Sequence, residues 1–176
     1  MHQEAVDATE KYLTFDPNDS IAYLSLALSY SQLGRQEDSM KAAYQSIKLD
    51  PKNAAAYSVL GLSYRVLGNH EEAIKAFRMS IKLGPDFGPS PYCLLADSFA
   101  AIGKYQEAKS AYEQALEIDP NNASAYAGIA AAHAECSDFK KAIEYQRKAI
   151  GLGDDEVRAE YEKRLAAYKA NKPWRQ

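Results

Sequence analysis

The sequence of 176 residues lacks several features that mark particular classes of protein. Its two cysteines, Cys93 and Cys136, are too few for a disulfide framework, so a reducing compartment and a cytoplasmic location are expected. No apolar run reaches the ~18 residues of a membrane span, and no charged-then-apolar leader is present. The formal net charge is -3 without a Lys/Arg block. We therefore expect neither membrane insertion nor nucleic acid binding.

Motifs for catalysis and cofactor binding are also absent. There is no phosphate-cradling glycine loop, nucleophile elbow, paired-histidine motif or EF-hand loop. His133 and Cys136 could reach one metal ion from one helix, but no further ligand is spaced to complete a site. We expect His133 to be a substituted core position and Cys136 a small buried thiol. Cys93 has no His, Lys or Arg within a turn to lower its pKa. The sequence thus predicts no enzyme, no cofactor and no metal.

What the sequence does contain is a repeat of about 34 residues. Three sets of marker residues share one register, with a single extra residue at about Gly88, which chance does not produce. The sets are Pro17, Pro51, Pro85 and Pro120; Gly34, Gly68 and Gly103; and Tyr23, Tyr57, Tyr92 and Tyr126.

Residues 54–87 show the repeat unit most clearly, as two short helices around a turn at Gly68. Each helix has an apolar stripe at helical spacing. The stripes are Tyr57, Leu60, Gly61 and Tyr64 on the first helix, and Ala73, Phe77 and Ser80 on the second. Because Gly61 and Ala73 are small, the two helices can approach closely. Gly68 permits the positive φ of a tight reversal, and Pro85 ends the second helix.

This pattern resembles the tetratricopeptide repeat (TPR) family, in which an aromatic, Leu-Gly, Tyr, Ala, an aromatic, Ala and Pro recur. The resemblance implies an all-α, right-handed α-solenoid: half a repeat, four repeats and a C-terminal capping helix in one domain over residues 1–170. The expected parts are an orphan second helix (1–19), four repeats (20–53, 54–88, 89–122 and 123–153), a capping helix (154–170) and a tail (171–176). The run from Asp138 to Pro173 is similar to the ends of many bacterial TPR proteins.

Local signals refine this outline. Asn53 and Asn122 are expected to cap the helices that follow them, each worth ~1 kcal/mol over Ala, and Asp19 or Ser20 to cap the helix through Tyr23. The fourth repeat is the most divergent, and Ser137 replaces its turn glycine. We expect that reversal to be looser or locally strained.

The first helix is expected to lack a partner. Ala5, Thr9 and Tyr12 lie where Ala73, Phe77 and Ser80 lie in the full unit, but no first helix precedes them. Two explanations stay open: the sequence is a piece of a longer repeat array, or the orphan face docks on another chain and drives homo-oligomer formation.

The resemblance implies that the first helices of the repeats line a concave groove, which here is mostly apolar or small. We predict an interaction scaffold that binds a peptide or amphipathic helix of another protein there. Arg65 and Asp97 would set the orientation of the bound segment. The candidate groove residues are Leu24, Leu28, Ser58, Leu62, Arg65, Val66, Cys93, Asp97, Ala127 and Ala131. The alternatives are that neighbouring repeats cover these residues, or that the chain is a self-assembling module.

One function of the family is excluded. TPR co-chaperones that bind the acidic C-termini of heat-shock proteins use a Lys/Asn/Asn/Lys/Arg carboxylate clamp on these faces. The corresponding positions here are Leu24, Leu28, Ser58, Ser90 and Leu94. A terminal carboxylate would find no cation except Arg65.

Overall fold

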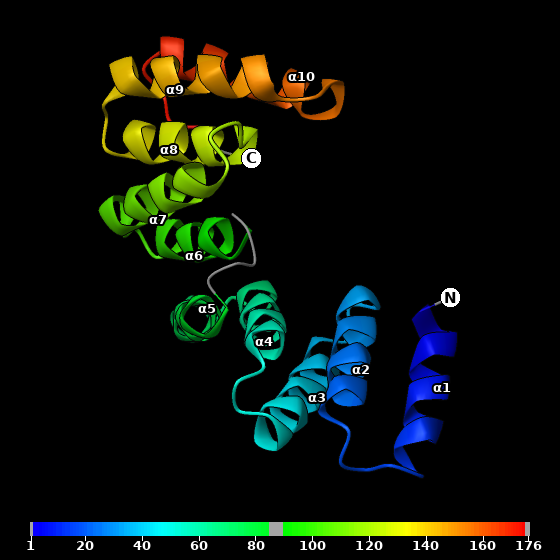
Figure 1. The fold of residues 1–176 in the computed structure, drawn as a ribbon. Coiled ribbons are helices and arrows are strands. Elements are labelled where there is room, and N and C mark those ends of the chain that lie inside the picture. Colours follow the sequence, from blue (N-terminus) through cyan, green and yellow to red (C-terminus); the bar gives the residue numbers. More distant parts are fainter. Residues whose placement is uncertain (1, 85–89, 175–176) are drawn as a thin grey trace. The chain divides into compact units, whose positions relative to one another are not determined.

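A computed structural model describes residues 2–84 and 90–174, and these parts of the chain form ten α-helices and no strand (Figure 1). The helices fall into two compact units, α1 to α5 and α6 to α10. Their bounds are α1 (His2–Leu13), α2 (Ser20–Gln32), α3 (Gln36–Leu49), α4 (Ala54–Val66), α5 (His70–Leu83), α6 (Ser90–Ala101), α7 (Tyr105–Ile118), α8 (Ala123–Glu135), α9 (Phe139–Leu152) and α10 (Asp155–Lys169). The prediction of an all-helical solenoid built from helix-turn-helix repeats is confirmed.

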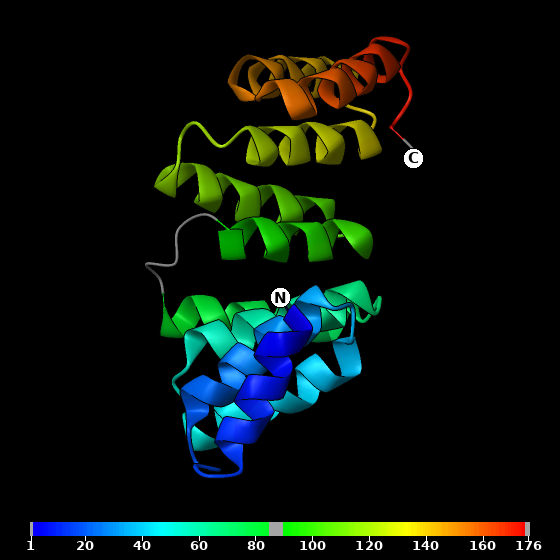
Figure 2. The same ribbon diagram turned by 90° about the vertical axis from the view of Figure 1, so that its right-hand side faces the viewer.

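Consecutive helices pack as pairs. The pairs are α2 with α3, α4 with α5, α6 with α7, and α8 with α9, while α1 packs on α2 and α10 packs on α9. Figure 2 shows the helices of the second unit stacked in chain order, from α6 to α9 and α10. The longest helix, α10, has 15 residues. Within residues 2–84 and 90–174, no helix combines the length and apolar character that crossing a bilayer requires.

Close helix approach within a pair depends on small residues. A Cβ added to Gly61 on α4 would lie 2.7 Å from the ring of Phe77 on α5, which is fully buried. The glycine therefore makes room for the phenyl ring, as the sequence predicted. In the first repeat the same two places hold Ala27 and Ala43, and both are fully buried.

Buried serines add directional contacts in the first unit. The Ser39 hydroxyl donates to the Ala27 carbonyl at 2.8 Å, and the Ser46 hydroxyl donates to the Ser20 carbonyl at 2.8 Å. Across to the next repeat, Ser63 Oγ lies 3.0 Å from Ser39 Oγ. We call this the serine seam. It joins α2, α3 and α4 by hydrogen bonds from side chains that are fully removed from solvent.

The helix starts follow the predicted caps. Asn53 Oδ1 accepts from the Ala56 N–H at 3.1 Å, and Asn122 Oδ1 accepts from the Ala125 N–H at 2.9 Å. Of the two candidates for α2, Asp19 is the cap, because its Oδ1 accepts from the second and third residues of the helix at 2.8 and 3.1 Å. Each such bond is worth ~1 kcal/mol relative to alanine.

The fourth turn is strained but not looser than the others. Gly34, Gly68 and Gly103 have φ of 74°, 79° and 76°, and Ser137 has φ of 61°. After every turn the next N–H donates at 2.9 Å to a carbonyl of the preceding helix, including Asp138 N–H to the His133 carbonyl. The serine therefore keeps the reversal of its glycine counterparts, at a conformational cost of order 1 kcal/mol.

Candidate functional site

Six of the predicted groove residues lie on α2 and α4, two contacting helices of the first unit. The most exposed are Leu28 and Val66, with 44% and 56% of their surface accessible. Leu24 is partly buried against the core of the unit. We call this surface the α2–α4 face; it consists of Leu24, Leu28, Ser58, Leu62, Arg65 and Val66.

The repeat predicts that these side chains share one face. Leu28 and Leu62 are 34 residues apart, so they take the same place in successive first helices. Their neighbours Ala27 and Gly61 point instead into the helix pairs and are buried. Arg65 is half-buried, and among the described residues it forms no ion pair.

In the second unit, one of the equivalent positions is buried. Ala127 on α8 is only 2% exposed and packs with Ala149 and Tyr161, so it offers no surface to a partner. Ala131 is partly exposed. Burial was the alternative that the sequence left open, and it applies at Ala127.

Cys93 and Asp97 lie on α6. Burial, together with the nearby Asp97 carboxylate, raises the pKa of the Cys93 thiol to about 11, so the thiol stays protonated and weakly nucleophilic at neutral pH. Asp97 is exposed, and its Oδ1 accepts a hydrogen bond from the Tyr112 hydroxyl at 2.5 Å. The carboxylate is thus already held by its own repeat.

The His133 and Cys136 pair does not form a metal site in the structure. Within residues 2–84 and 90–174 no group of three or more His, Cys, Asp or Glu side chains is placed to hold an ion. His133 is 8% exposed and stacks on Tyr145 with ring centroids 5.6 Å apart, which confirms its core role. The prediction of a buried thiol at Cys136 is wrong. Cys136 is exposed because it occupies the C-cap of α8, outside the helix packing.

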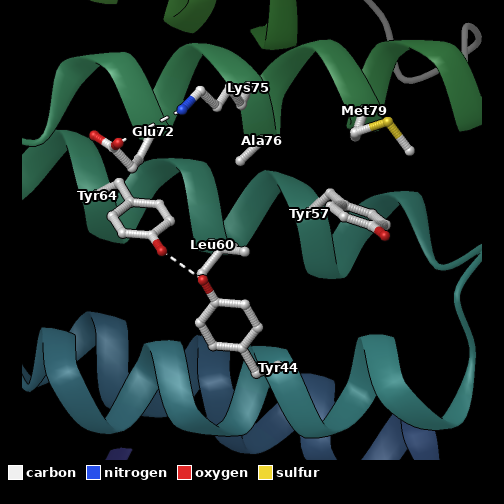
Figure 3. Close-up of a pocket in the computed structure, with 8 residues that line it drawn as sticks. All are labelled: Tyr44, Tyr57, Leu60, Tyr64, Glu72, Lys75, Ala76 and Met79. Carbon is white, nitrogen blue, oxygen red and sulfur yellow. Dashed lines mark hydrogen bonds and ion pairs between the residues drawn. The ribbon is translucent and has the colours of Figure 1, made fainter.

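The structure also contains a tyrosine-lined pocket that sequence reasoning missed (Figure 3). Its volume is about 210 Å³ and it lies among α3, α4 and α5. The hydroxyls of Tyr44 and Tyr64 share a hydrogen bond, and Lys75 Nζ lies 3.7 Å from Glu72 Oε1 at the rim. The lining residues are Tyr44, Tyr57, Leu60, Tyr64, Glu72, Lys75, Ala76 and Met79.

An equivalent pocket lies one repeat earlier, with a volume of about 360 Å³. Each of its lining residues precedes a residue of the first pocket by 34 positions. They are Tyr23, Leu26, Tyr30, Asp38, Lys41, Ala42 and Gln45. Glu10 replaces Tyr44 as the hydrogen-bond partner, here of the Tyr30 hydroxyl. Tyr30 and Tyr44 both have a pKa raised to about 12, Tyr30 chiefly by burial and Tyr44 chiefly by its bond to Tyr64. The pockets follow from the repeat, and the recurring tyrosines are the signal that could have located them.

The orphan helix α1 leaves its predicted face uncovered. Ala5 is exposed, Thr9 is half-buried and Tyr12 is 46% exposed. The equivalent residues in all four full repeats are buried. They are Ser39, Ala43 and Ser46; Ala73, Phe77 and Ser80; Ala108, Tyr112 and Ala115; and Ala142, Gln146 and Ala149.

Helix pairs packed through small residues and repeated along the chain define an α-helical repeat scaffold. Three tetratricopeptide repeat models match the sequence, over residues 21–53, 52–121 and 93–157. The chain belongs to the tetratricopeptide repeat family. No curated protein matches the sequence significantly.

Solved structures with the same fold include other repeat proteins. The crystal structure of MamA is 28% identical, with a TM-score of 0.81, and the match covers 91% of this chain and 92% of that one. MamA 41-end from Desulfovibrio magneticus RS-1 is 17% identical, with a TM-score of 0.81 and coverage of 86% and 85%. YrrB, described as a TPR protein with an unusual peptide-binding site, is 19% identical, with a TM-score of 0.77 and coverage of 94% and 84%. At these last two identities the similarity concerns the fold alone.

Proposed function

We propose that this chain is a non-catalytic, cytoplasmic scaffold that binds a peptide or amphipathic helix of another protein on the α2–α4 face. The observation that supports the proposal best is the pair of exposed apolar side chains Leu28 and Val66, beside the partly exposed Leu24 and Leu62. Soluble proteins seldom expose contiguous apolar patches without using or covering them.

The chemistry of the face favours an apolar segment with little charge. Leu24, Leu28, Leu62 and Val66 would be the anchors for the apolar side chains of the bound segment. Arg65 is the cation of this face and would orient the partner through a carboxylate. An occupant that buried about 1,200–2,000 Å² in total would form a contact of ordinary size.

The proposal does not extend to a heat-shock-protein clamp. At the clamp positions the chain has Leu24 and Leu28 where cations or amides are needed, and Ser58, Ser90 and Leu94 carry no charge. A terminal carboxylate buried on these residues would lose its hydration without gaining a charged partner.

The groove proposal is tested with peptides selected on the purified chain. Leu28→Glu with Leu62→Glu puts two carboxylates on the α2–α4 face, and we expect affinity for the selected peptides to fall by about tenfold or more. Ile118→Glu with Leu152→Glu is the matched control, because both residues are exposed apolar side chains on other helices. Helicity measured by circular dichroism should be unchanged in both variants. Equal binding by the face variant and its control would exclude this surface.

A second candidate function is self-association through α1. It is favoured by the contrast between Ala5, Thr9 and Tyr12, which α1 leaves accessible, and the buried residues at the same places in every full repeat. Apolar and small surfaces shaped for a helix gain free energy when a helix covers them. Light scattering over a wide concentration range tests the idea, and a chain that stays monomeric throughout would exclude it.

A further inference from the structure

Each terminal helix of the described chain presents a face that a partner helix covers in every full repeat. α1 occupies the place of a second helix without its first, and α10 occupies the place of a first helix without its second (Figure 1). The uncovered face of α1 is therefore one that normally receives a first helix, and the uncovered face of α10 is one that normally receives a second helix.

The hydrogen bonds of α1 establish its register. Glu10 bonds the Tyr30 hydroxyl as Tyr44 bonds the Tyr64 hydroxyl, and both pairs are related by 34 residues. Each α1 residue thus corresponds to the α3 residue 34 positions later, and to the α5 residue 68 positions later. Ala5 and Thr9 take the places of Ser39 and Ala43.

The packing of α10 establishes its register in the same way. Tyr168 lies in one buried cluster with Ala142, as Ser63 bonds Ser39, and Ala142 and Ser39 are equivalent second-helix positions. Tyr168 therefore takes the place of Ser63 on α4. The remaining correspondences are Ala159 with Ala54, Glu162 with Tyr57, Ala166 with Gly61, and Lys169 with Tyr64, and all four α10 residues are exposed.

We propose that α10 of one copy packs antiparallel on α1 of a second copy, so that two chains complete one repeat between them. This inference rests on the self-association proposed above and adds the surface that α1 binds. Its centre would place Ala166 against Thr9. The first repeat already contains a comparable small pair, the fully buried Ala27 and Ala43.

The charges of the two faces also match. In the second repeat Tyr57 and Met79 line one pocket together with Tyr64 and Glu72. The same places between two copies hold Glu162 facing Lys11, and Lys169 facing Glu4. Both juxtapositions bring opposite charges together.

Tyr12 is the residue of α1 that differs most from its counterparts, which are Ser or Ala. Its hydroxyl donates to Asp19 Oδ2 at 3.0 Å, which ties the ring to the start of α2. With the ring held there, Ala5 and Thr9 remain accessible at the centre of the face.

A contact between two different surfaces has consequences for assembly. Each copy offers one face of each kind, so association continues into open arrays unless the geometry closes a ring. A single helix pair is at the low end of interface size, below about 1,200 Å² in total, so assembly should be strongly dependent on concentration.

The test blocks one face at a time. Ala5→Arg obstructs α1 and Ala166→Arg obstructs α10, while Ala101→Arg is a control at another exposed alanine. Sedimentation velocity should show concentration-dependent association of the wild type and the control. We expect each face variant alone to associate about tenfold or more weakly. An equimolar mixture of the two face variants should form 1:1 complexes and nothing larger, because each contributes one intact face.

The outcomes separate this inference from the proposals on which it builds. Undiminished association of the Ala166→Arg variant would overturn the role of α10 and leave self-association through α1 standing. A wild type that is monomeric at every concentration would overturn both, without bearing on the α2–α4 face, which peptide binding tests.

A charge exchange checks the antiparallel pairing independently. Glu4→Lys or Lys169→Glu alone should weaken association, and the two changes in one chain should restore it, with all effects reduced at high salt. If Lys169→Glu had no effect, or if the double change failed to restore association, the proposed contact between Glu4 and Lys169 would be wrong.

Discussion

The second and fourth repeats have the same helix pair and differ in what reaches the surface of their first helices. In the second repeat Ser58 and Arg65 are partly exposed on α4, and Ala127 and Ala134 take their places in the fourth repeat. In the fourth, Ala127 and Ala134 on α8 are buried because Tyr161 and Tyr168 of α10 pack on them. A position in the repeat therefore does not by itself make a binding surface. The size of the residue and the covering helix decide whether the position is accessible.

The largest expected difference between these repeats concerns the centre of each helix pair. Phe77→Ala should lower the free energy of unfolding by about 3–5 kcal/mol, because a fully buried ring leaves a cavity beside Gly61. Gln146 holds the same place in the fourth repeat, where its amide donates to the Tyr161 carbonyl at 3.2 Å and its Oε1 has no hydrogen-bond partner among the described residues. Gln146→Ala should cost only about 1–2 kcal/mol. Urea unfolding measures both, and equal losses would contradict this account.

The turns of the second and fourth repeats should differ by a smaller amount of free energy. Ser137→Gly should stabilise the chain by about 1 kcal/mol, because glycine adopts the positive φ of 61° without strain. Gly68→Ala should destabilise it by a similar amount, and the cause is conformational, since an added Cβ would meet no atom of the described residues within 4 Å. Thermal unfolding of the two variants would show whether shifts of opposite sign occur.

The smallest expected effect is a difference between the two repeats in how stability depends on pH. Burial, with Lys109 and Lys141 nearby, lowers the pKa of His133, and Asp138 opposes the shift without reversing it. Because the unfolded chain then binds the proton more readily, stability is full above the unfolded pKa of about 6.5 and declines as the pH falls below it. His133→Tyr restores the residue found at Tyr64 in the second repeat. The variant should lose less stability than the wild type between pH 7.5 and 5.5, which urea midpoints would reveal.

Much of the fold could be predicted from spacing alone. The markers that share a 34-residue register placed the helices and turns, and Asn53 and Asn122 marked two helix starts because an amide at that place satisfies otherwise unpaired N–H groups. The strain at Ser137 followed from the missing glycine. Cys136 was assigned wrongly because its distance from the core depends on where α8 ends. The boundaries of the single predicted domain remain a prediction.

The candidate site was less predictable. Ala127 is buried in a cluster with Tyr161 of α10. The repeat pattern gives no reason to expect these two residues to meet. The tyrosine pocket depends on Tyr44 and Tyr64 meeting across neighbouring repeats. Periodicity gives the side of a helix on which a residue lies. It does not give the neighbour that covers the residue.

The serine seam has a consequence for selectivity. An interface of alanines alone would let adjoining helices slide along their axes with little change in energy, because smooth surfaces tolerate many alignments. The bonds from Ser39, Ser46 and Ser63 favour a single alignment, since any slide would leave buried hydroxyls without acceptors. The separation of Leu28 from Leu62 is thereby fixed before any partner arrives. A bound segment must match that interval or lose its contact with one of the two leucines. The first unit would therefore select its partners by the spacing of their apolar side chains as well as by their polarity.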